Sequence, residues 1–320
     1  MPGPADTWLL LSGGVGGAKL ALGLDRLLPR GALTVIANTG DDFIHLGLAI
    51  SPDLDTLTYT LADTVNPETG WGCRDETWNF MTALERVGGE TWFRLGDRDL
   101  ALHVERTRRL AAGEPLSQVT QTFCERLGIG SRILPMSDAR VETRVVTADG
   151  VLEFQDYFVR RRAQPAVTGL RYAGAESARP PAAALNALDD PRLRAIFIAP
   201  SNPWLSIDPI LAVPALRDAL RAARVPVVAV SPIVQGAALK GPTAKIMAEL
   251  GLPVTSASIA RHYREYLDGL ILDERDAEEI AAIKEPGLET AMTTTVMRSL
   301  EDRISLARFA VDFAARLRKN

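Results

Sequence analysis

The sequence is poor in cysteine and histidine, with two cysteines, Cys73 and Cys124, and three histidines among 320 residues. The cysteines form no CxxC pair, so neither a disulfide framework nor a thiolate zinc site is expected, and the chain is expected to stay in the reducing cytoplasm. The histidines lack the spacing of zinc proteases, and no Gly-x-Ser-x-Gly motif is present. Covalent serine chemistry is therefore not predicted.

Long apolar runs and a strong excess of one charge are also missing. No apolar stretch approaches the roughly 20 residues that span a bilayer, and the start of the chain lacks the basic region of a signal peptide. The formal net charge is -4, which argues against a broad nucleic-acid-binding face. We therefore expect neither a membrane nor a nucleic acid as partner. The 47% hydrophobic content allows one large α/β domain or a core with an inserted subdomain.

Lysine is scarce, because only five of the 36 cationic residues are lysine. Three of these five, Lys19, Lys240 and Lys245, lie in turns marked by glycine or proline beside apolar runs. A compact charge on a flexible stem suits phosphate oxygens. The alternative is that all three are solvated residues near helix starts.

A glycine-rich segment, LSGGVGGAKLALGL (11–24), follows the apolar run 8–11. It predicts a strand, a loop containing Gly13, Gly14, Gly16 and Gly17, and a helix that carries Lys19. Such a loop lets backbone N–H groups approach a phosphate at the helix N-terminus. It matches neither the P-loop, since leucine follows the lysine, nor the dinucleotide fingerprint. The glycines could instead serve only close packing of the strand and the helix.

The hydrophobic pattern predicts an α/β fold, a Rossmann-like doubly wound and mostly parallel sheet with an inserted α+β subdomain. We predict a nucleotide-binding core from 1–65 and 190–320, and an insertion at 66–189. Expected core strands cover 8–11, 32–37, 193–200, 225–230 and 270–272. Expected core helices begin at 52 and cover 208–223, 243–250 and 304–317. In the insertion we expect helices around 75–87 and 98–127 and a hairpin made of 140–147 and 151–161.

The loops at the strand ends, 12–19, 38–42, 201–206 and 231–245, are expected to meet at one edge of the sheet. Ser201 and Asn202 could bind a base edge or a phosphate, or could equally form a turn and a helix cap. Ser231 and Gly236, with Lys240 and Lys245, could hold the other side of a diphosphate. Two such loops suggest a nucleotide or a diphosphate ester as ligand.

Four carboxylates lie within fifteen residues on the same edge: Asp41, Asp42, Asp53 and Asp55. A diphosphate usually shares its charge with a divalent metal, and carboxylate oxygens suit Mg²⁺. We expect Asp41, Asp42 or Asp53 to bind that metal. Helix capping and solubility are the alternative explanation.

Nine sequence blocks, in this order, resemble the 2-phospho-L-lactate transferases of coenzyme F420 biosynthesis. They are SGGVGGAKL (12–20), NTGDD (38–42), SPDLDT (51–56), GWG (70–72), LGDRDL (95–100), PSNP (200–203), SPIV (231–234), ALKGPTAK (238–245) and ARHY (260–263). The resemblance spans about residues 8 to 275. It implies transfer of a phospho-acyl unit of phospholactate, phosphoenolpyruvate or phosphoglycerate type from a guanosine diphosphate ester to the ribityl hydroxyl of the deazaflavin Fo. GMP is released, and Mg²⁺ assists this phosphotransferase.

The resemblance also implies roles for residues. The glycine loop with Lys19, the 201–202 segment and the 231–245 loop would hold the guanosine diphosphate portion. Asp55 and Arg94 would bind Fo, for which the insertion would supply part of the site. Asp41, Asp42 and Asp55 would carry the catalysis. A cytoplasmic homodimer is expected.

One residue departs from the family pattern, because Gln235 stands where a second glycine would precede Gly236. We hypothesise that Gln235 affects the choice of donor. A competing interpretation of the whole chain is a regulator without enzymatic activity that binds a nucleotide sugar on a related core. A nicotinamide dehydrogenase is disfavoured by Lys19 and by the lack of a convincing acid/base pair for hydride transfer.

Overall fold

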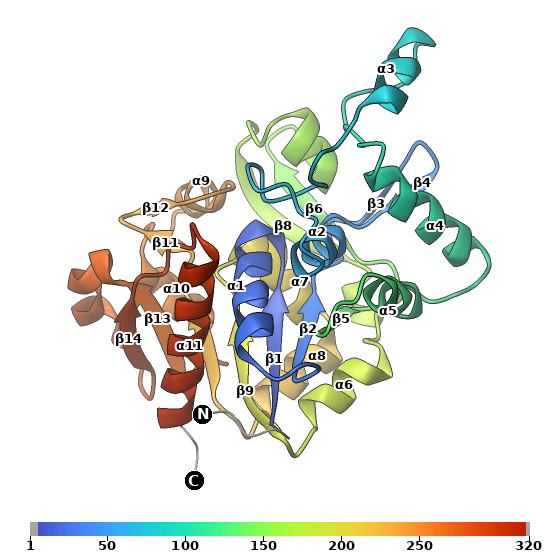
Figure 1. Cartoon of the computed structure of the whole chain (residues 1–320). Helices are drawn as coiled ribbons and strands as arrows, with labels where there is room; N and C mark the ends of the chain where they lie inside the picture. Colours follow the sequence, from blue (N-terminus) through green and yellow to red (C-terminus); the bar gives the residue numbers. More distant parts are fainter. Residues whose placement is uncertain (1–5, 318–320) are drawn as a thin grey trace.

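A sheet of seven parallel strands forms the centre of the computed structural model, which describes residues 6–317 (Figure 1). Its strand order is β14-β13-β10-β9-β1-β2-β5. The bounds are Thr7–Ser12 (β1), Leu33–Ala37 (β2), Arg132–Pro135 (β5), Leu193–Ile198 (β9), Val227–Val230 (β10), Gly269–Asp273 (β13) and Glu289–Thr293 (β14). The expected Rossmann-like α/β fold is confirmed.

The central strands are apolar along their whole length because helices cover both faces of the sheet. Alternate residues of β1 enter two different cores: Leu9 and Leu11 pack on one side, and Trp8 and Leu10 on the other. The second core includes α1 (Gly14–Leu27) and α11 (Leu300–Arg316), which lie side by side in Figure 1. The first includes residues of α7 (Asp208–Leu211), α8 (Pro214–Arg221) and α10 (Ser256–His262).

The strand order reverses between β1 and β9. From β1 the chain builds outward through β2 to β5, and it then returns through α6 (Ala182–Leu188) to β9 on the other side of β1. The register aligns Leu11 of β1 with Ile36 of β2 and Ile198 of β9. The loops after these three strands therefore leave from the same edge, where ligands bind in open α/β sheets.

Further elements complete the fold. The helices are α2 (Pro52–Leu61), α3 (Asn79–Arg86), α4 (Asp99–Ala111), α5 (Leu116–Arg126) and α9 (Thr243–Glu249). The strands are β3 (Phe43–His45), β4 (Leu48–Ile50), β6 (Glu142–Thr147), β7 (Gly150–Glu153), β8 (Val167–Ala173), β11 (Ile233–Val234) and β12 (Ala237–Ala238). Short helical turns cover Asp156–Arg160, Ala175–Ser177, Pro203–Ile207 and Glu274–Ala282. In Figure 1, α3 extends away from the body of the molecule.

Several expected elements differ in the structure. The expected strand 151–161 ends at Glu153, and a helical turn follows it. The expected helix 208–223 is two helices, because Pro214 has no N–H to continue the first one. Strand β14 had no prediction. Strand β5 lies inside the interval assigned to the insertion but pairs with β2 in the central sheet, so 132–135 belong to the core. The rest of the division into core and insertion stays a prediction.

No helix in the described part of the chain is both long and apolar enough to cross a membrane.

Candidate active site

The glycine loop connects β1 to α1 at the point where the strand order reverses. Gly13 has an extended backbone and is the N-cap residue of α1, which begins at Gly14. Because glycine has no side chain, the N-cap residue itself gives no capping hydrogen bond. Ser201, after β9, ties the loop down: its hydroxyl donates to the carbonyl oxygen of Gly13 at 2.6 Å. Ser201 is thus occupied in holding two strand ends together, which is the turn role that the sequence left open.

Three of the four glycines are explained by close packing. A Cβ on Gly13 would lie 2.6 Å from Asp53 Oδ2, one on Gly16 2.5 Å from the carbonyl oxygen of Pro200, and one on Gly17 2.9 Å from Ser201 Oγ. Gly14 differs, because its φ of +65° favours glycine while the nearest atom to an added Cβ is 4.0 Å away. Close packing and a half-buried helix N-terminus therefore occur in the same loop.

Two of the predicted acids meet at this N-terminus. Asp53, from the first turn of α2, accepts the N–H of Gly14 at 2.6 Å. The amide of Asn38, which follows β2, donates to Asp53 Oδ2 at 2.9 Å and to Asp41 Oδ1 at 3.2 Å. Asn38 therefore holds Asp41 and Asp53 together beside the glycine loop.

Asp42 lies next to this pair. Its Oδ2 accepts the hydroxyl of Ser51 at 2.7 Å, whereas its buried Oδ1 has no hydrogen-bond partner among the described residues. The buried hydroxyls of Ser12, Thr39 and Thr143 also lack partners there. Buried polar atoms are rarely left unpaired, so this concentration at the ends of β1 and β2 is typical of a ligand site.

Asp41, Asp42 and Asp53 form an acidic cluster whose pKa values are all raised. Burial and the neighbouring carboxylates of Asp53 and Asp42 raise the pKa of Asp41 well above its usual value. Burial raises the pKa of Asp42 in the same direction and that of Asp53 to about 6. Three desolvated carboxyl groups cannot all ionise easily without a counter-charge. The carboxylate oxygens of Asp41 and Asp42 fit a hard divalent cation such as Mg²⁺.

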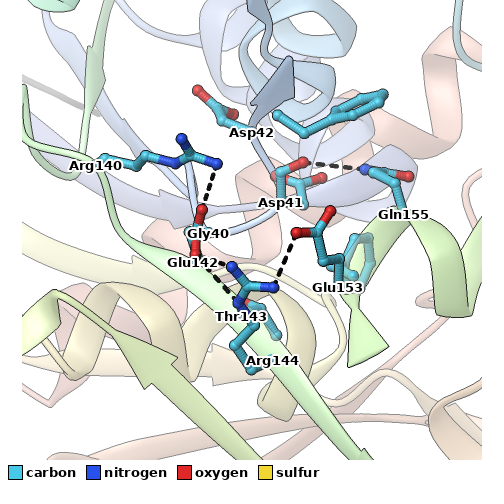
Figure 2. Close-up of a pocket in the computed structure, with 11 residues that line it drawn as sticks. Gly40, Asp41, Asp42, Arg140, Glu142, Thr143, Arg144, Glu153 and Gln155 are labelled. Atoms are coloured by element: carbon cyan, nitrogen blue, oxygen red, sulfur yellow. Dashed lines mark hydrogen bonds and ion pairs between the residues drawn. The ribbon is translucent and has the colours of Figure 1, made fainter. Parts of the chain in front are cut away.

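A pocket opens beside these acids (Figure 2). Its wall is the β6–β7 hairpin, with Arg140, Arg144 and their shared partner Glu142. Gln155 closes the floor by donating to the carbonyl oxygen of Asp41 at 3.0 Å. Sequence reasoning missed this wall, because alternating charged residues of a hairpin look like an ordinary solvated face.

Asp55, the fourth predicted acid, contacts Arg106 and not the other three carboxylates. It forms a buried ion pair with Arg106 of α4, in which Nη2 bonds Oδ1 and Nη1 bonds Oδ2 at 3.2 Å. His103 Nδ1 lies 3.6 Å from the same carboxylate, and burial lowers the pKa of this histidine. Burial opposes the charge of Arg106, yet Asp55 raises the pKa of this arginine above its usual value. Asp55 is thus a neutralised anion. Arg106 was missed because nothing in the sequence links positions 55 and 106.

The second predicted loop, 231–245, contains the β11–β12 hairpin. Ser231 is buried, with its hydroxyl 2.8 Å from Ser256 Oγ, so it stabilises the turn. Gln235 and Gly236 form the tip with φ of +52° and +67°. A two-residue hairpin turn with two positive φ values favours glycine, so the turn accounts for the glycine expected at position 235 and not for the glutamine found there. The Gln235 side chain is exposed.

Two of the predicted lysines lie near the glycine loop. Lys19 is half-buried, and burial followed by the charges of Arg303 and Lys240 lowers its pKa. Lys240 lies 3.6 Å from the position of an added Cβ on Gly70, which itself approaches Val15 of the glycine loop. Arg303 and Lys240 thus each repel the charge of Lys19, whose ammonium donates to the carbonyl oxygen of Met297 at 2.8 Å, and this excess of positive charge favours an anion beside Lys19. The buried Nε of Arg303 has no partner among the described residues. Sequence analysis missed Arg303 because it precedes a segment whose amphipathic pattern predicts only a packing helix.

The remaining predicted residues have other contacts. Lys245 pairs with Glu249 at 2.6 Å and donates to the carbonyl oxygen of Pro165, so Glu249 already neutralises its charge. Arg94 is exposed and stacks on Trp78 at 4.0 Å. No contact given by the structure brings either one to the acidic cluster. Asn202 caps a helical turn through Oδ1, while its Nδ2 has no partner among the described residues.

Comparisons with known proteins agree on the family. The family model described as "2-phospho-L-lactate transferase CofD" matches residues 9–302. A phosphoenolpyruvate transferase from Streptomyces griseus is 42% identical over 316 residues, covering 97% of this chain and 99% of the relative. One from Mycobacterium tuberculosis is 42% identical over 310 residues, covering 89% and 93%.

The fold also has a relative among solved structures. A crystal structure of a UPF0052 family protein from Bacillus halodurans superposes with a TM-score of 0.61 at 14% identity, covering 95% of this chain and 99% of that protein. At this identity the likeness concerns the fold alone.

Proposed function

Because the chain belongs to the 2-phospho-L-lactate transferase CofD family, we propose that it moves a phospho-acyl unit from a guanosine diphosphate ester to the ribityl hydroxyl of Fo and releases GMP. The family and its relatives support a phosphoacyl transferase of F420 biosynthesis. The names of the relatives favour phosphoenolpyruvate as the acyl unit. The acidic cluster at the N-terminus of α1 is the observation that carries the proposal.

The donor binds along the glycine loop in this proposal. The first turn of α1 offers backbone N–H groups, and Lys19, Lys240 and Arg303 supply positive charge beside it. The free amide of Asn202 is one further donor. We leave Lys245 out of this set, because Glu249 and a carbonyl oxygen already occupy its ammonium group.

Mg²⁺ would be held by Asp42, whose buried Oδ1 has no partner among the described residues, together with Asp41, and would neutralise charge on the diphosphate. Asp53 keeps its oxygens on Gly14 and Asn38 and positions the loop. Asp42 accepts the proton of the ribityl hydroxyl as that oxygen bonds to the transferred phosphorus. The bond from phosphorus to GMP breaks, and GMP leaves with the electron pair. Positioning and charge neutralisation are the main contributions in such a transfer.

The acceptor binds on the Asp55 side in this proposal. Asp55 is ion-paired with Arg106, and its role in this proposal is to accept a hydrogen bond from Fo. The pocket between Asp41 and the β6–β7 hairpin lies next to the same edge, and its volume of about 20 Å³ admits a water molecule rather than Fo. The roles of Arg94 in Fo binding and of a homodimer stay predictions.

Product analysis tests the proposal. The chain is incubated with Fo, Mg²⁺ and guanosine diphosphate esters of phosphoenolpyruvate, phospholactate or phosphoglycerate, and products are identified by mass spectrometry while GMP is quantified by chromatography. We expect transfer from at least one donor and its loss in Asp42→Asn. Tight nucleotide binding without transfer from any donor, and without binding of Fo, would instead favour the regulator.

Gln235→Gly separates donor choice from turn geometry. If the Gln235 side chain contacts the donor, the ratio of rates with the three esters changes in this variant. An equal ratio in both proteins would remove Gln235 from donor choice, and the variant would differ only in turn geometry, since glycine adopts the turn more readily.

A further inference from the structure

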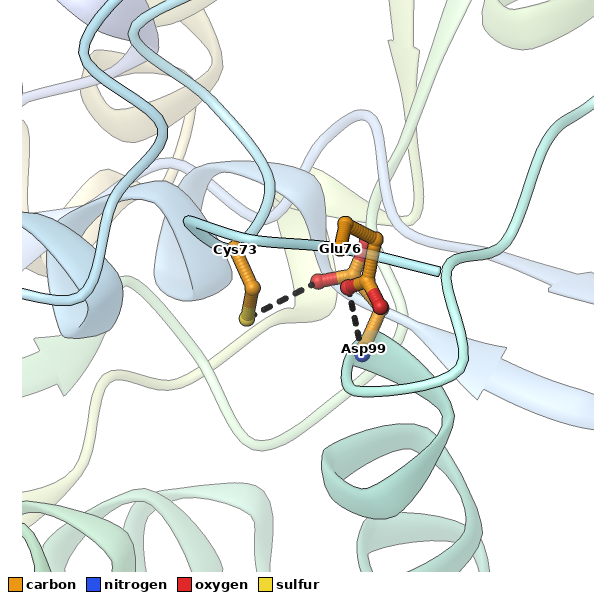
Figure 3. A group of neighbouring side chains, drawn as sticks. All are labelled: Cys73, Glu76 and Asp99. Carbon is orange, nitrogen blue, oxygen red and sulfur yellow. Dashed lines mark hydrogen bonds between the residues drawn. The ribbon is translucent and has the colours of Figure 1, made fainter. Parts of the chain in front are cut away.

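Two groups of neighbouring polar side chains differ in how their oxygens are used. In one group, Cys73, Glu76 and Asp99 lie together (Figure 3), and Cys73 Sγ donates to Asp99 Oδ1 at 3.5 Å. The backbone N–H of Asp99 donates to Glu76 Oε2 at 3.2 Å, and Tyr59 also bonds the Asp99 carboxylate. These contacts fasten the start of α4 to the segment before α3. In the other group, Asp42 Oδ1 has no hydrogen-bond partner among the described residues.

Two local hydrogen bonds shape the loop that leads to Asp42. The N–H of Gly40 donates to Asn38 Oδ1 at 2.8 Å, and the N–H of Asp42 donates to the carbonyl oxygen of Thr39 at 3.2 Å. The carboxylate of Asp42 is held through Oδ2 alone, by the hydroxyl of Ser51 at 2.7 Å. The direction of its Oδ1 therefore depends on how the peptide before Asp42 is oriented.

The segment around the β6–β7 hairpin holds the same loop through two further hydrogen bonds. The N–H of Thr143 donates to the carbonyl oxygen of Gly40 at 2.6 Å, and Gln155 Nε2 donates to that of Asp41 at 3.0 Å (Figure 2). Glycine permits this approach, because a Cβ at Gly40 would lie 2.6 Å from Thr143 Oγ1. The carbonyl group of Asp41 belongs to the peptide that leads into Asp42. The side chain of Gln155 therefore fixes the plane of that peptide.

Gln155 is itself rigidly held. It is 5% exposed and lies where the chain leaves β7 and enters the π-helical turn Asp156–Arg160. Tyr157 of this turn is fully buried in the core on one face of the sheet, which anchors the turn. π-helical turns are rare and often occur at functional sites. A buried amide on such a support can orient the group that it bonds.

The space next to Gln155 is sized for water. The pocket that Gln155 lines together with Asp41 and Asp42 has a volume of about 20 Å³, which admits one water molecule. Mg²⁺ usually keeps several of its own waters when a protein binds it through one or two carboxylates. The pocket therefore accommodates a water of such a cation, whereas the donor and Fo are too large for it. Gln155 accordingly has no direct role in binding either substrate.

We propose that Gln155 is a positioning residue: its amide fixes the peptide between Asp41 and Asp42 and thereby aims the unpartnered oxygen of Asp42 at a divalent cation. This inference rests on the proposed function, in which Asp41 and Asp42 hold Mg²⁺. Partners that orient metal ligands matter because their loss typically lowers metal affinity or activity about 10–100-fold. Gln155 follows Asp41 by 114 residues, so no local pattern links the two. The β6–β7 region thus contributes to catalysis without contacting the reacting groups.

Metal binding tests the inference without relying on turnover. Gln155→Met removes the amide donor at similar size, and Gln121→Met is the matched control, because the Gln121 amide bonds Glu125 on the exposed face of α5. Mn²⁺ replaces Mg²⁺, and its binding to the full chain with saturating GDP is followed by electron paramagnetic resonance. We expect the Mn²⁺ affinity to fall about tenfold or more in Gln155→Met and to stay unchanged in Gln121→Met. GDP affinity in a metal chelator should be equal in all three proteins.

The rate of transfer gives a second measurement. With a donor that supports transfer, we expect kcat to fall in Gln155→Met while KM for Fo stays the same, because the amide bonds Asp41 and not the substrate. Circular dichroism checks that each variant is folded. If Gln155→Met does not fold, Gln155→Asn decides, since its amide is one carbon shorter and cannot reach the carbonyl oxygen of Asp41 in the same way.

Unchanged Mn²⁺ affinity in the folded Gln155 variant would overturn the inference, whatever its rate of transfer. An equal loss in Gln121→Met, or a wild-type chain that binds no Mn²⁺ in the presence of GDP, would overturn it as well. Failure of the proposed function gives a different result: Mn²⁺ binds more weakly to Gln155→Met than to the wild-type chain, yet no donor supports transfer in either protein.

Discussion

The buried ion pair between Asp55 and Arg106 allows a quantitative prediction. Their side chains are 7% and 3% exposed, and the guanidinium also donates to the carbonyl oxygen of Ala49 at 3.2 Å. Removing one partner leaves the other charge buried without compensation, which costs about 3–5 kcal/mol. We therefore expect Arg106→Met and Asp55→Leu each to lower the free energy of unfolding by about that amount.

The double variant is the decisive measurement. With both charges replaced by apolar side chains of similar size, no uncompensated charge remains, and such replacements are often nearly neutral. We expect Asp55→Leu/Arg106→Met to lose far less than the sum of the single variants, by about 3 kcal/mol or more. Equilibrium unfolding in urea measures all three. Arg108→Met is the control, because its pair with Glu105 is exposed and should contribute little to stability.

Additive losses, or single losses as small as that of the control, would refute the reasoning about the buried pair. Function gives a second measurement. If Asp55 binds Fo, the double variant folds yet shows a raised KM for Fo with unchanged GDP affinity. A fully active double variant would restrict Asp55 to a structural role.

Three further predictions concern the glycine loop and its acids. Gly16→Ala should destabilise the chain, because its methyl group would lie 2.5 Å from the carbonyl oxygen of Pro200; this overpacking costs about 1–3 kcal/mol against a gain of about 1 kcal/mol in helix propensity, and a raised urea midpoint would contradict it. Lys19→Ala should weaken GDP binding by about 1–3 kcal/mol in calorimetry, whereas Lys245→Ala, whose ammonium is paired, should not. The raised pKa of Asp53, about 6 against 3.8, means that the folded state binds its proton more tightly. Its contribution is therefore complete below pH 4 and lost as the pH rises through 6, so in a metal chelator the unfolding free energy should fall over that range, with Asp53→Asn flattening the slope.

Local patterns predicted the edge of the sheet well. The glycine loop, the buried strands and the carboxylates after β2 could be placed because apolar runs and glycine clusters report on neighbours in sequence. The convergence of the 12–19 and 38–42 loops followed from parallel topology, and the hydrogen bonds of Asn38 to Asp41 and Asp53 agree with it.

Local patterns did not predict which residues the charged side chains and the β5 strand would contact. Lys245 and Lys240 stand five residues apart in one glycine-marked segment, yet one pairs with Glu249 and the other lies near the glycine loop. Lys245 lies inside α9, one turn before Glu249, whereas Lys240 precedes this helix. Strand β5 escaped prediction for the same reason, because its four residues become a core strand only when they pair with β2.

The sequence by itself determined the α/β class, the family and the glycine loop, because these depend on periodicity and on blocks of adjacent residues. Only the tertiary structure decided that Arg106 neutralises Asp55, that Arg303 joins the lysines, and that Cys73 meets Asp99. Such contacts join residues up to hundreds of positions apart, and burial then sets their charges. Their energies depend on distance and desolvation in space, which no local pattern records.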